Sequence, residues 1–326
     1  MPSQLVFDYN IHSNYYVASN QRGQLYLDRF DKDRPIGLEK ISVPAILAQC
    51  HHRVRSLSLD WINHLLYLIN TDLNHIEVIK LLKPNKVLVF AENLHEAQDI
   101  KVNPIESWIV WSEKGQIIRM SQDGSERKLI TDQVIMPMGL TIDYLSQQIY
   151  WLDAKLHSLN SIHFDGSNQR IILNSEQYLG HPFDIDVFDN TVFWSDLHTG
   201  SVYVTDKFGR NSGIYELFTN NRLRHQNVTY LDTIDSYKQP RNESYDCPLN
   251  CPYRCNATLS CICPEPYVLC SDMNGDDHQC LKHCSNVVNT MSKKIFSFLH
   301  IASLLIILMI ILFVFIKCCQ KIRKFR

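Results

Sequence analysis

Apolar and polar residues alternate in short, strand-like runs along the first 240 residues, and no stretch there has the 3.6-residue period of a helix. The first residues of five repeat copies within these runs are 51, 43, 40 and 43 residues apart. Because a four-stranded propeller blade occupies roughly 40–45 residues, this period predicts an all-β propeller. Three copies carry a Trp with an acidic residue two positions later: Val110-Trp111-Ser-Glu, Tyr150-Trp151-Leu-Asp and Phe193-Trp194-Ser-Asp. Two weaker copies begin at Tyr67 and Tyr16.

Turn signals recur in the same order within each period. Asp60, Asn103 and Asp143 each lie seven residues before the start of a motif. Asp123-Gly124 and Asp165-Gly166 come later in their periods and predict hairpins with type I′ turns, because Asp-Gly between apolar runs is a strong hairpin signal. A single four-stranded sheet exposes two apolar faces, so we expect the sheets to stack in a ring with the motif aromatics wedged between neighbours.

Cysteines are concentrated between residues 247 and 284, and this density predicts a disulfide-stabilised module in an oxidising compartment. No C-x2-C pair occurs there, which argues against a zinc site. Eight cysteines allow 105 connectivities, and spacing alone does not choose among them. The eight are Cys247, Cys251, Cys255, Cys261, Cys263, Cys270, Cys280 and Cys284.

Residues 295–316 form a charge-free apolar run that is long enough to cross about 30 Å of hydrocarbon as a helix. The tail at 317–326 is rich in Lys and Arg, so we expect it in the cytoplasm and the cysteine-rich module outside, as in a single-pass type I protein. Cys318 and Cys319 adjoin the span and are candidates for palmitoylation. The first residues lack a signal peptide, from which we expect the sequence to be incomplete at its N-terminus.

Composition and motifs exclude several classes of function. Thirty-two Lys and Arg residues against 34 Asp and Glu leave a formal net charge of −2, so no nucleic-acid partner is expected. No phosphate loop, nucleophile elbow or H-E-x-x-H motif occurs, which indicates that the protein is not an enzyme. Residues 272–277 resemble the start of an EF-hand but lack its glycine and closing glutamate, so calcium has only partial support and no cofactor is predicted. Three sequons predict glycosylation at Asn227, Asn242 and Asn256.

The repeats resemble the YWTD propeller of the low-density lipoprotein receptor family, in which six blades are followed by an EGF-like module. The likeness covers roughly residues 5–285 and is closest from Met138 to Gly200, where the sequence is similar to lipoprotein and yolk-protein receptors. Five motif-bearing repeats are present where the family has six. The implied domains are a propeller at 1–240, an EGF-like module at 245–284, a transmembrane helix at 295–316 and a short tail at 317–326. The family's pairing implies the disulfides Cys247–Cys255, Cys251–Cys261, Cys263–Cys280 and Cys270–Cys284.

The resemblance also implies a pH-sensing surface. His157 and His181 occupy the positions of family histidines on the propeller face that captures ligand-binding modules in acid, and Lys155 and Trp151 belong to the same matched segments. Histidine suits this role because it gains its charge between neutral pH and endosomal acidity. Lys114 stands where the family often has an aromatic residue, so this part of the surface departs from the family pattern.

The function implied is that of the membrane-anchored part of an endocytic receptor for lipoprotein or yolk protein, at the plasma membrane and in endosomes. In this interpretation the propeller drives acid-dependent release and recycling, upstream modules bind the cargo, and a propeller-folding chaperone assists. The ten-residue tail has no Asn-Pro-x-Tyr sorting motif, so internalisation by the family's usual route is not expected. Two alternatives remain open: a propeller–EGF binding module of the Wnt co-receptor or nidogen type, and a truncated decoy without endocytic activity.

Overall fold

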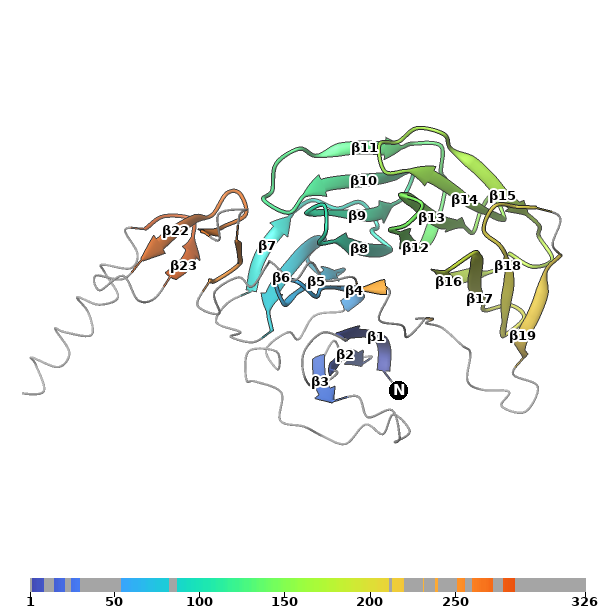
Figure 1. Cartoon of the computed structure of the whole chain (residues 1–326), viewed down its shortest axis with the longest axis horizontal. Coiled ribbons are helices and arrows are strands. Elements are labelled where there is room, and N and C mark those ends of the chain that lie inside the picture. The colour runs from blue at the N-terminus through green and yellow to red at the C-terminus, as the bar shows by residue number, and fades with distance from the viewer. Residues whose placement is uncertain are drawn as a thin grey trace, which may run out of the picture. The chain divides into compact units, whose positions relative to one another are not determined.

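The computed structural model of the chain is almost entirely β-structure over the part that it describes (Figure 1). The chain separates into two compact units, Met1–Pro266 and Tyr267–Arg326. The backbone is described for residues 2–8, 15–20 and 25–29, and the structure further describes residues 54–81, 87–210, 213–219, 231, 238–239, 251–255, 260–271 and 278–284.

Five antiparallel sheets follow one another along the first unit, and each is built from consecutive strands. The first sheet has three strands, β1 (Pro2–Asp8), β2 (Tyr15–Asn20) and β3 (Leu25–Arg29). The second sheet has four strands, β4 (Val54–Asp60), β5 (Leu65–Asn70), β6 (His75–Lys80) and β7 (Val87–Ala91). The third also has four, β8 (Asp99–Asn103), β9 (Trp108–Glu113), β10 (Gln116–Ser121) and β11 (Lys128–Thr131). The fourth sheet consists of β12 (Pro137–Asp143), β13 (Gln148–Asp153), β14 (Ser158–His163) and β15 (Arg170–Asn174). The fifth consists of β16 (Pro182–Phe188), β17 (Thr191–Asp196), β18 (Ser201–Asp206) and β19 (Tyr215–Thr219).

Each repeat copy lies in the second strand of its sheet, so the predicted repeats are the observed sheets. The turn that leads into this strand is fixed by the Asp or Asn found seven residues before the motif. Asp60 accepts hydrogen bonds from the backbone N–H groups of Ile62 and Asn63 at 3.0 and 2.8 Å. Asn103 and Asp143 accept equivalent bonds in the next two sheets. Side chains that mimic a backbone turn in this way explain why the spacing recurs.

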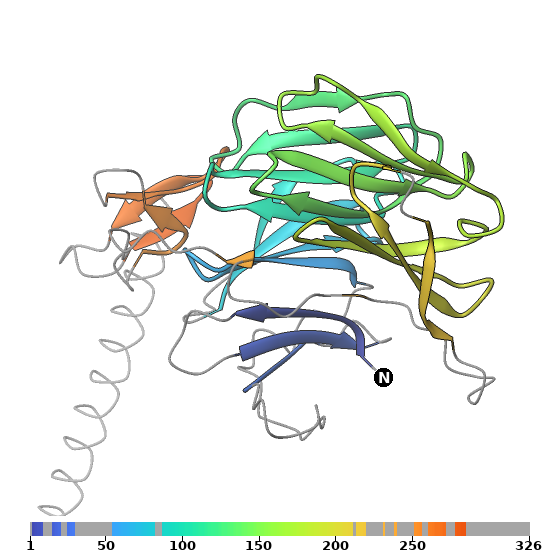
Figure 2. The same cartoon turned by 45° about the vertical axis from the view of Figure 1, so that its right-hand side comes forward.

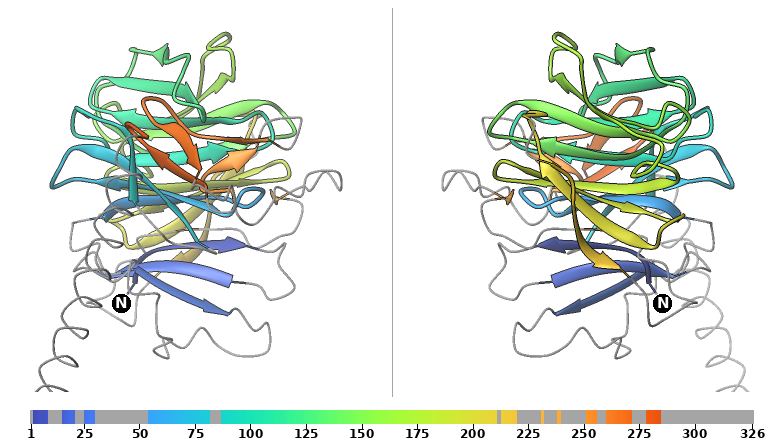
Figure 3. Two further views of the ribbon diagram at one scale, coloured as in Figure 1. Left: turned by 90° about the vertical axis from the view of Figure 1, so that its left-hand side faces the viewer. Right: turned by 90° about the vertical axis from the view of Figure 1, so that its right-hand side faces the viewer.

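An apolar core lies between the third and fourth sheets, and another lies between the fourth and fifth. Two successive residues of one motif contribute to two different cores, because they point to opposite faces of their strand. Val110 shares a core with Trp151 of the following sheet, and Tyr150 shares the next core with Trp194. Residues i and i+1 of a strand point to opposite faces, so one motif serves two interfaces. The expected wedging of aromatics between sheets is therefore confirmed, and Figures 2 and 3 show the successive sheets layered face to face.

The first strands of successive sheets contact one another, β1 with β4, β4 with β8, β8 with β12 and β12 with β16. In Figure 1 these strands face a common centre, and the fourth strands lie outside. The approach of β12 to β16 depends on Gly139, since a Cβ atom there would lie 2.9 Å from Asp184 Cα. Only glycine permits backbones to come this close.

One local expectation was wrong. The Asp-Gly hairpins do not contain type I′ turns, which need positive φ at both central residues. Only the glycine is left-handed, with φ of +86° at Gly124 and +85° at Gly166. Gly124 N–H donates to Ser121 O, and the side chain of Asp123 accepts from Ser125 N–H at 3.0 Å. The aspartate therefore accepts a hydrogen bond within a longer loop and does not itself take a left-handed conformation.

Short strand pairs follow the propeller sheets. β20 (Arg254–Cys255) pairs with β21 (Cys261–Ile262) in the first unit, and β22 (Val268–Ser271) pairs with β23 (His278–Leu281) in the second. Among the described residues, no helix is long and apolar enough to span a membrane. The predicted transmembrane segment, 295–316, and the tail, 317–326, lie outside the described residues.

Candidate functional site

The last residue of the repeat motif organises the loops at one end of the sheets. Asp153 Oδ1 accepts hydrogen bonds from the N–H groups of Lys155 and Leu156 at 2.9 and 3.0 Å, and Oδ2 accepts one from Ile135 N–H at 2.7 Å. Asp196 repeats this arrangement one sheet later, where its Oδ2 accepts from His181 N–H at 2.8 Å. Each carboxylate therefore joins two segments of its sheet by hydrogen bonds: the turn that follows the second strand and the loop that precedes the first strand.

Two predicted site residues, His157 and His181, lie in these linked loops. His157 is half-buried with a left-handed φ of 49°, and its Nδ1 lies 2.8 Å from Leu179 O. A carbonyl oxygen only accepts, so Nδ1 of His157 carries the hydrogen that is donated to Leu179 O. His181 is exposed two residues after Leu179. The fold thus brings the two predicted histidines to one loop surface.

A third histidine belongs to this surface and was not predicted. The ring of His198 lies 6.1 Å from that of His181, measured between centroids, and both are exposed. His198 follows Asp196 by two residues, just as Lys155 follows Asp153. Alignment of the repeats on their final aspartate would have placed it beside the predicted residues.

The same loops expose apolar side chains. Ile135, Met136 and Leu156 are 52%, 48% and 42% exposed, and Ala154 N–H donates to Met136 O, which keeps the two loops adjacent. Lys155 is exposed beside them. We call Ile135, Met136, Lys155, Leu156, His157, His181 and His198 the loop surface.

Two other residues that the family resemblance singled out lie in different environments. Trp151 is fully buried in the core between its own sheet and the preceding one. It therefore stabilises the packing of these two sheets and cannot contact a ligand directly. Lys114 is exposed and forms an ion pair with Glu96, with Nζ and Oε1 2.8 Å apart. Its charge is therefore in contact with solvent.

The cysteine-rich segment inserts a tyrosine into the second and third sheets. Tyr253 is fully buried, its hydroxyl donates to Gln122 O at 2.6 Å, and it lies 2.5 Å from the hydroxyl of Tyr67. Lys80 Nζ donates to Tyr253 O at 3.0 Å, and Arg254 bonds to Ser107 Oγ at 2.7 Å. Burial lowers the pKa of Lys80 to about 8, although the charge of Asp60 opposes the shift. We call Tyr67, Lys80, Gln122 and Ser107 the tyrosine socket.

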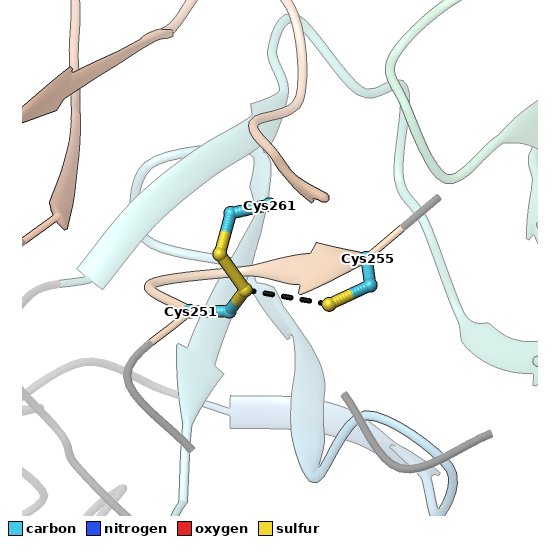
Figure 4. A group of neighbouring side chains, drawn as sticks. All are labelled: Cys251, Cys255 and Cys261. Carbon is cyan, nitrogen blue, oxygen red and sulfur yellow. Dashed lines mark hydrogen bonds between the residues drawn. A yellow bond between two sulfur atoms is a disulfide. The ribbon is translucent and has the colours of Figure 1, made fainter. Parts of the chain in front are cut away.

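Cys251, Cys255 and Cys261 lie close enough together to hold a metal, but all three form disulfides. Cys251 is bonded to Cys261, and the Cys251 and Cys255 sulfurs lie 3.3 Å apart (Figure 4). Cys255 is also disulfide-bonded, so neither sulfur has a proton to donate and this contact is a non-bonded one. Cys270 is bonded to Cys284 in the second unit. Thiolates are the form that holds a metal, so this sulfur cluster is structural.

These two disulfides are among the four pairs that the family resemblance implies. Cys263 and Cys280 are disulfide-bonded as well. Several other predictions lie outside the described residues: the disulfide at Cys247, the sequons at Asn227, Asn242 and Asn256, the partial EF-hand at 272–277, and the palmitoylation sites Cys318 and Cys319.

Comparison with known proteins identifies relatives of this chain. Residues 147–188 match the family model described as low-density lipoprotein receptor repeat class B. The vitellogenin receptor Yl of Drosophila melanogaster is 30% identical over 220 residues, which is 65% of this chain and 10% of that receptor. The vitellogenin receptor of Solenopsis invicta is 24% identical over 259 residues, 76% of this chain and 14% of that protein. The sortilin-related receptor of Mus musculus is 34% identical over 158 residues, 47% of this chain and 7% of that protein.

Among solved structures, a nidogen–laminin complex matches the fold with a TM-score of 0.54 and 20% identity, over 65% of this chain and 78% of that one. The receptor resemblance derived from the repeats is thereby confirmed, and the receptors concerned form a non-enzymatic family. The matched part of this chain spans only 10% and 14% of the length of the two vitellogenin receptors. The chain contains a low-density lipoprotein receptor class B repeat of the YWTD propeller type and is homologous to the vitellogenin receptors.

Proposed function

We propose that this chain is the membrane-anchored part of a yolk-protein or lipoprotein receptor and that its propeller promotes release of cargo in acid. The observation that carries the proposal is the loop surface, whose linked loops expose Lys155, His181 and His198, half-bury His157, and expose the apolar side chains of Ile135, Met136 and Leu156. The similarity to vitellogenin receptors supports yolk protein as the cargo class.

The mechanism is electrostatic. The loop surface presents Lys155 and three imidazoles together with the exposed apolar side chains of Ile135, Met136 and Leu156. Histidine gains its charge between neutral pH and endosomal acidity, so the positive charge of the loop surface increases in an endosome. A cysteine-rich acidic ligand-binding module of a receptor would then dock by charge complementarity and contact with the apolar side chains. Docking displaces the cargo that this module carried.

The remaining parts of the proposal concern placement in the cell. A sixth blade would complete the ring, residues 295–316 would anchor the protein as a type I membrane protein, and a propeller-folding chaperone would act during synthesis. In this arrangement the sheets and the cysteine-rich segment face the cell exterior and then the endosome lumen, where oxidised disulfides persist.

Binding of the chain to an immobilised acidic ligand-binding module, measured at pH 7.4 and pH 5.5, tests the mechanism. We expect at least about tenfold tighter binding at pH 5.5, and we expect His157→Ala combined with His181→Ala to remove this difference because the added charge is lost. His163→Ala is the matched control, since His163 lies at the opposite end of β14 from His157.

Two outcomes would count against the proposal. Acid-selective docking that is unchanged in the double variant would eliminate the histidine mechanism. Binding that is equal at both pH values would favour the alternative of a pH-independent protein-binding module of nidogen type.

A further inference from the structure

Two exposed histidines, His181 and His198, lie next to each other at one end of the fifth sheet. Their ring centroids are 6.1 Å apart and the ring planes are inclined by 50°, so the rings are close but not stacked. His181 lies in the loop before β16, and His198 lies in the turn between β17 and β18. Two imidazoles from different segments of the chain therefore share one small area of the loop surface. We call them the histidine pair.

The backbones of both histidines are fixed by one buried carboxylate. Asp196 is fully buried, its Oδ2 accepts from His181 N–H at 2.8 Å, and its Oδ1 accepts from His198 N–H at 2.9 Å. Leu197 N–H donates to His181 O at 2.8 Å, which adds a backbone bond between the two segments. The positions of the two residues relative to each other are therefore set by the fold.

Gly180, the residue before His181, leaves room for the ring of His198. A Cβ atom at position 180 would lie 3.9 Å from His198 Cδ2 and 3.2 Å from Glu176 O. The imidazole of His198 thus lies against the loop that carries His181. A side chain at position 180 would compete with this ring for space, so glycine permits the close approach of the pair.

His157 contributes to the same surface in a different way. The residue is half-buried, its Nδ1 donates to Leu179 O at 2.8 Å, and its backbone oxygen accepts from Ser175 N–H at 2.9 Å. Both bonds hold the loop that leads to His181. His157 therefore positions this loop, whereas the histidine pair is exposed to a partner.

We propose that the histidine pair binds one carboxylate of the docking module between its two rings in acid. This proposal rests on the function proposed above and deepens it, because it names the group that the module presents, an Asp or Glu side chain. A charged imidazole N–H donates to a carboxylate oxygen at about 2.7–2.9 Å. Rings whose centroids are 6.1 Å apart are close enough for both to bond to a single carboxylate.

The charged and titratable groups around the pair come from three described segments. Glu176 is exposed in the loop before β16, and Asp196 bonds to the backbones of both histidines. Lys155 is exposed and His157 is half-buried in the turn between β13 and β14. Glu176 is therefore the one exposed anion among these groups.

Proton uptake and docking favour each other at this pair. Histidine gains its charge between neutral pH and endosomal acidity, so both rings become cations there. Two like charges at this separation repel, and a carboxylate between them replaces repulsion by attraction. Docking therefore draws protons onto both rings, and a fall in pH strengthens docking.

Lys155 indicates which replacement separates charge from titration. Lys155 N–H donates to Asp153 Oδ1 just as His198 N–H donates to Asp196 Oδ1, so the two residues hold the same place in successive sheets. His198→Lys gives the fifth sheet the side chain of the fourth, with a positive charge that persists at neutral pH. His198→Ala removes the charge altogether.

Binding of the full chain to the immobilised acidic module at pH 7.4 and pH 5.5 tests the pair. Calorimetry at pH 6.5 in two buffers of different ionisation enthalpy adds the number of protons taken up on docking. We expect His198→Ala to weaken docking at pH 5.5 by roughly three- to tenfold and to lower the uptake by up to about one proton. His198→Lys should dock at pH 5.5 within about threefold of the wild type, and more tightly than the wild type at pH 7.4. His163→Ala is the matched control and should behave as the wild type.

The outcomes separate the pair from the wider mechanism. Acid-selective docking with the same affinity and proton uptake in His198→Ala as in the wild type would overturn the pair and leave the proposed function standing. His198→Lys that docks no better than the wild type at pH 7.4 would also overturn it, and this variant decides the question if His198→Ala does not fold. Failure of the proposed function would appear in the wild type itself, as docking that is equal at both pH values, and the pair would be overturned with it.

Discussion

At the scale of single residues, the aspartate that ends the repeat motif fixes loops, whereas the motif aromatics fill the cores between sheets. Asp153 is fully buried and satisfies the backbone N–H groups of Ile135, Lys155 and Leu156. A buried donor that loses its acceptor costs about 1–3 kcal/mol, so a carboxylate with several donors fixes both of its loops.

Asp153→Ala should therefore lower the free energy of unfolding by about 3–5 kcal/mol, through several unsatisfied backbone donors. Urea denaturation at pH 7.4 measures this change. Asp165→Ala is the control, because Asp165 is exposed and accepts from Ser167 in a surface turn. A midpoint for Asp153→Ala that equals that of the control would show that the loops do not depend on this carboxylate.

At the scale of elements, the contact of β12 with β16 sets how closely two sheets approach at the axis. Gly139 lies against the backbone of Phe183, Asp184 and Ile185, and a Cβ atom on Gly139 would lie within 3.0 Å of all three. Backbone atoms cannot move aside as a flexible side chain can. This one position therefore limits the spacing of the fourth and fifth sheets.

Gly139→Ala should destabilise the protein by about 2–4 kcal/mol, because the added methyl group forces the two strands apart. Gly115→Ala is a useful control, since no atom lies within 4 Å of its Cβ position and the cost is limited to a left-handed backbone at φ of +78°. Thermal unfolding of both variants measures the difference. A smaller loss at Gly139 than at Gly115 would contradict the close-approach argument.

Much of the element pattern could be predicted from the sequence because the information is periodic. The motifs that contain Val110, Tyr150 and Trp194 predicted both the strands and their packing between neighbouring sheets. The hairpin type was wrong because Asp-Gly is shared by two turn families, and only the backbone shows that Asp123 acts as an acceptor. The Asp-Gly dipeptide alone does not distinguish the two turn types.

The candidate site was predictable only where it lies inside a repeat. His157 and His181 stand in segments with strong family likeness, and His198 could have been found from its spacing after Asp196. Tyr253 could not, because its role depends on a partner 186 residues away in the chain. No local pattern distinguishes a buried Tyr from an exposed one before that partner is known.

At the scale of the whole molecule, the tyrosine socket joins the cysteine-rich segment to two propeller sheets. Tyr253 and Tyr67 share a hydrogen bond, and Gln122 contacts both, through its carbonyl oxygen and its side-chain nitrogen. The second contact point is a turn, where Glu265 N–H donates to Asp123 O at 2.8 Å. The Cys251–Cys261 disulfide joins the chain just before Tyr253 to the segment that leads to Glu265.

Tyr253→Ala should cost about 3–5 kcal/mol through loss of a buried aromatic ring, and Tyr253→Phe about 1–2 kcal/mol through loss of the hydroxyl alone. A double-mutant cycle with Tyr67→Phe isolates the bond between the hydroxyl groups, for which we expect a coupling of about 0.5–2 kcal/mol. Denaturant unfolding of the four proteins measures the cycle. Additive losses would show that the two hydroxyls act independently.

The socket also imposes an order on biosynthesis. Tyr67 leaves the ribosome 186 residues before Tyr253, an interval of roughly 10–40 s at ordinary elongation rates of about 5–20 residues per second. During that time Tyr67, Lys80 and the carbonyl of Gln122 have no tyrosine to bind, although the strands that carry them are already made. The second and third sheets therefore complete their packing around Tyr253 only after all the strands up to β19 have been made.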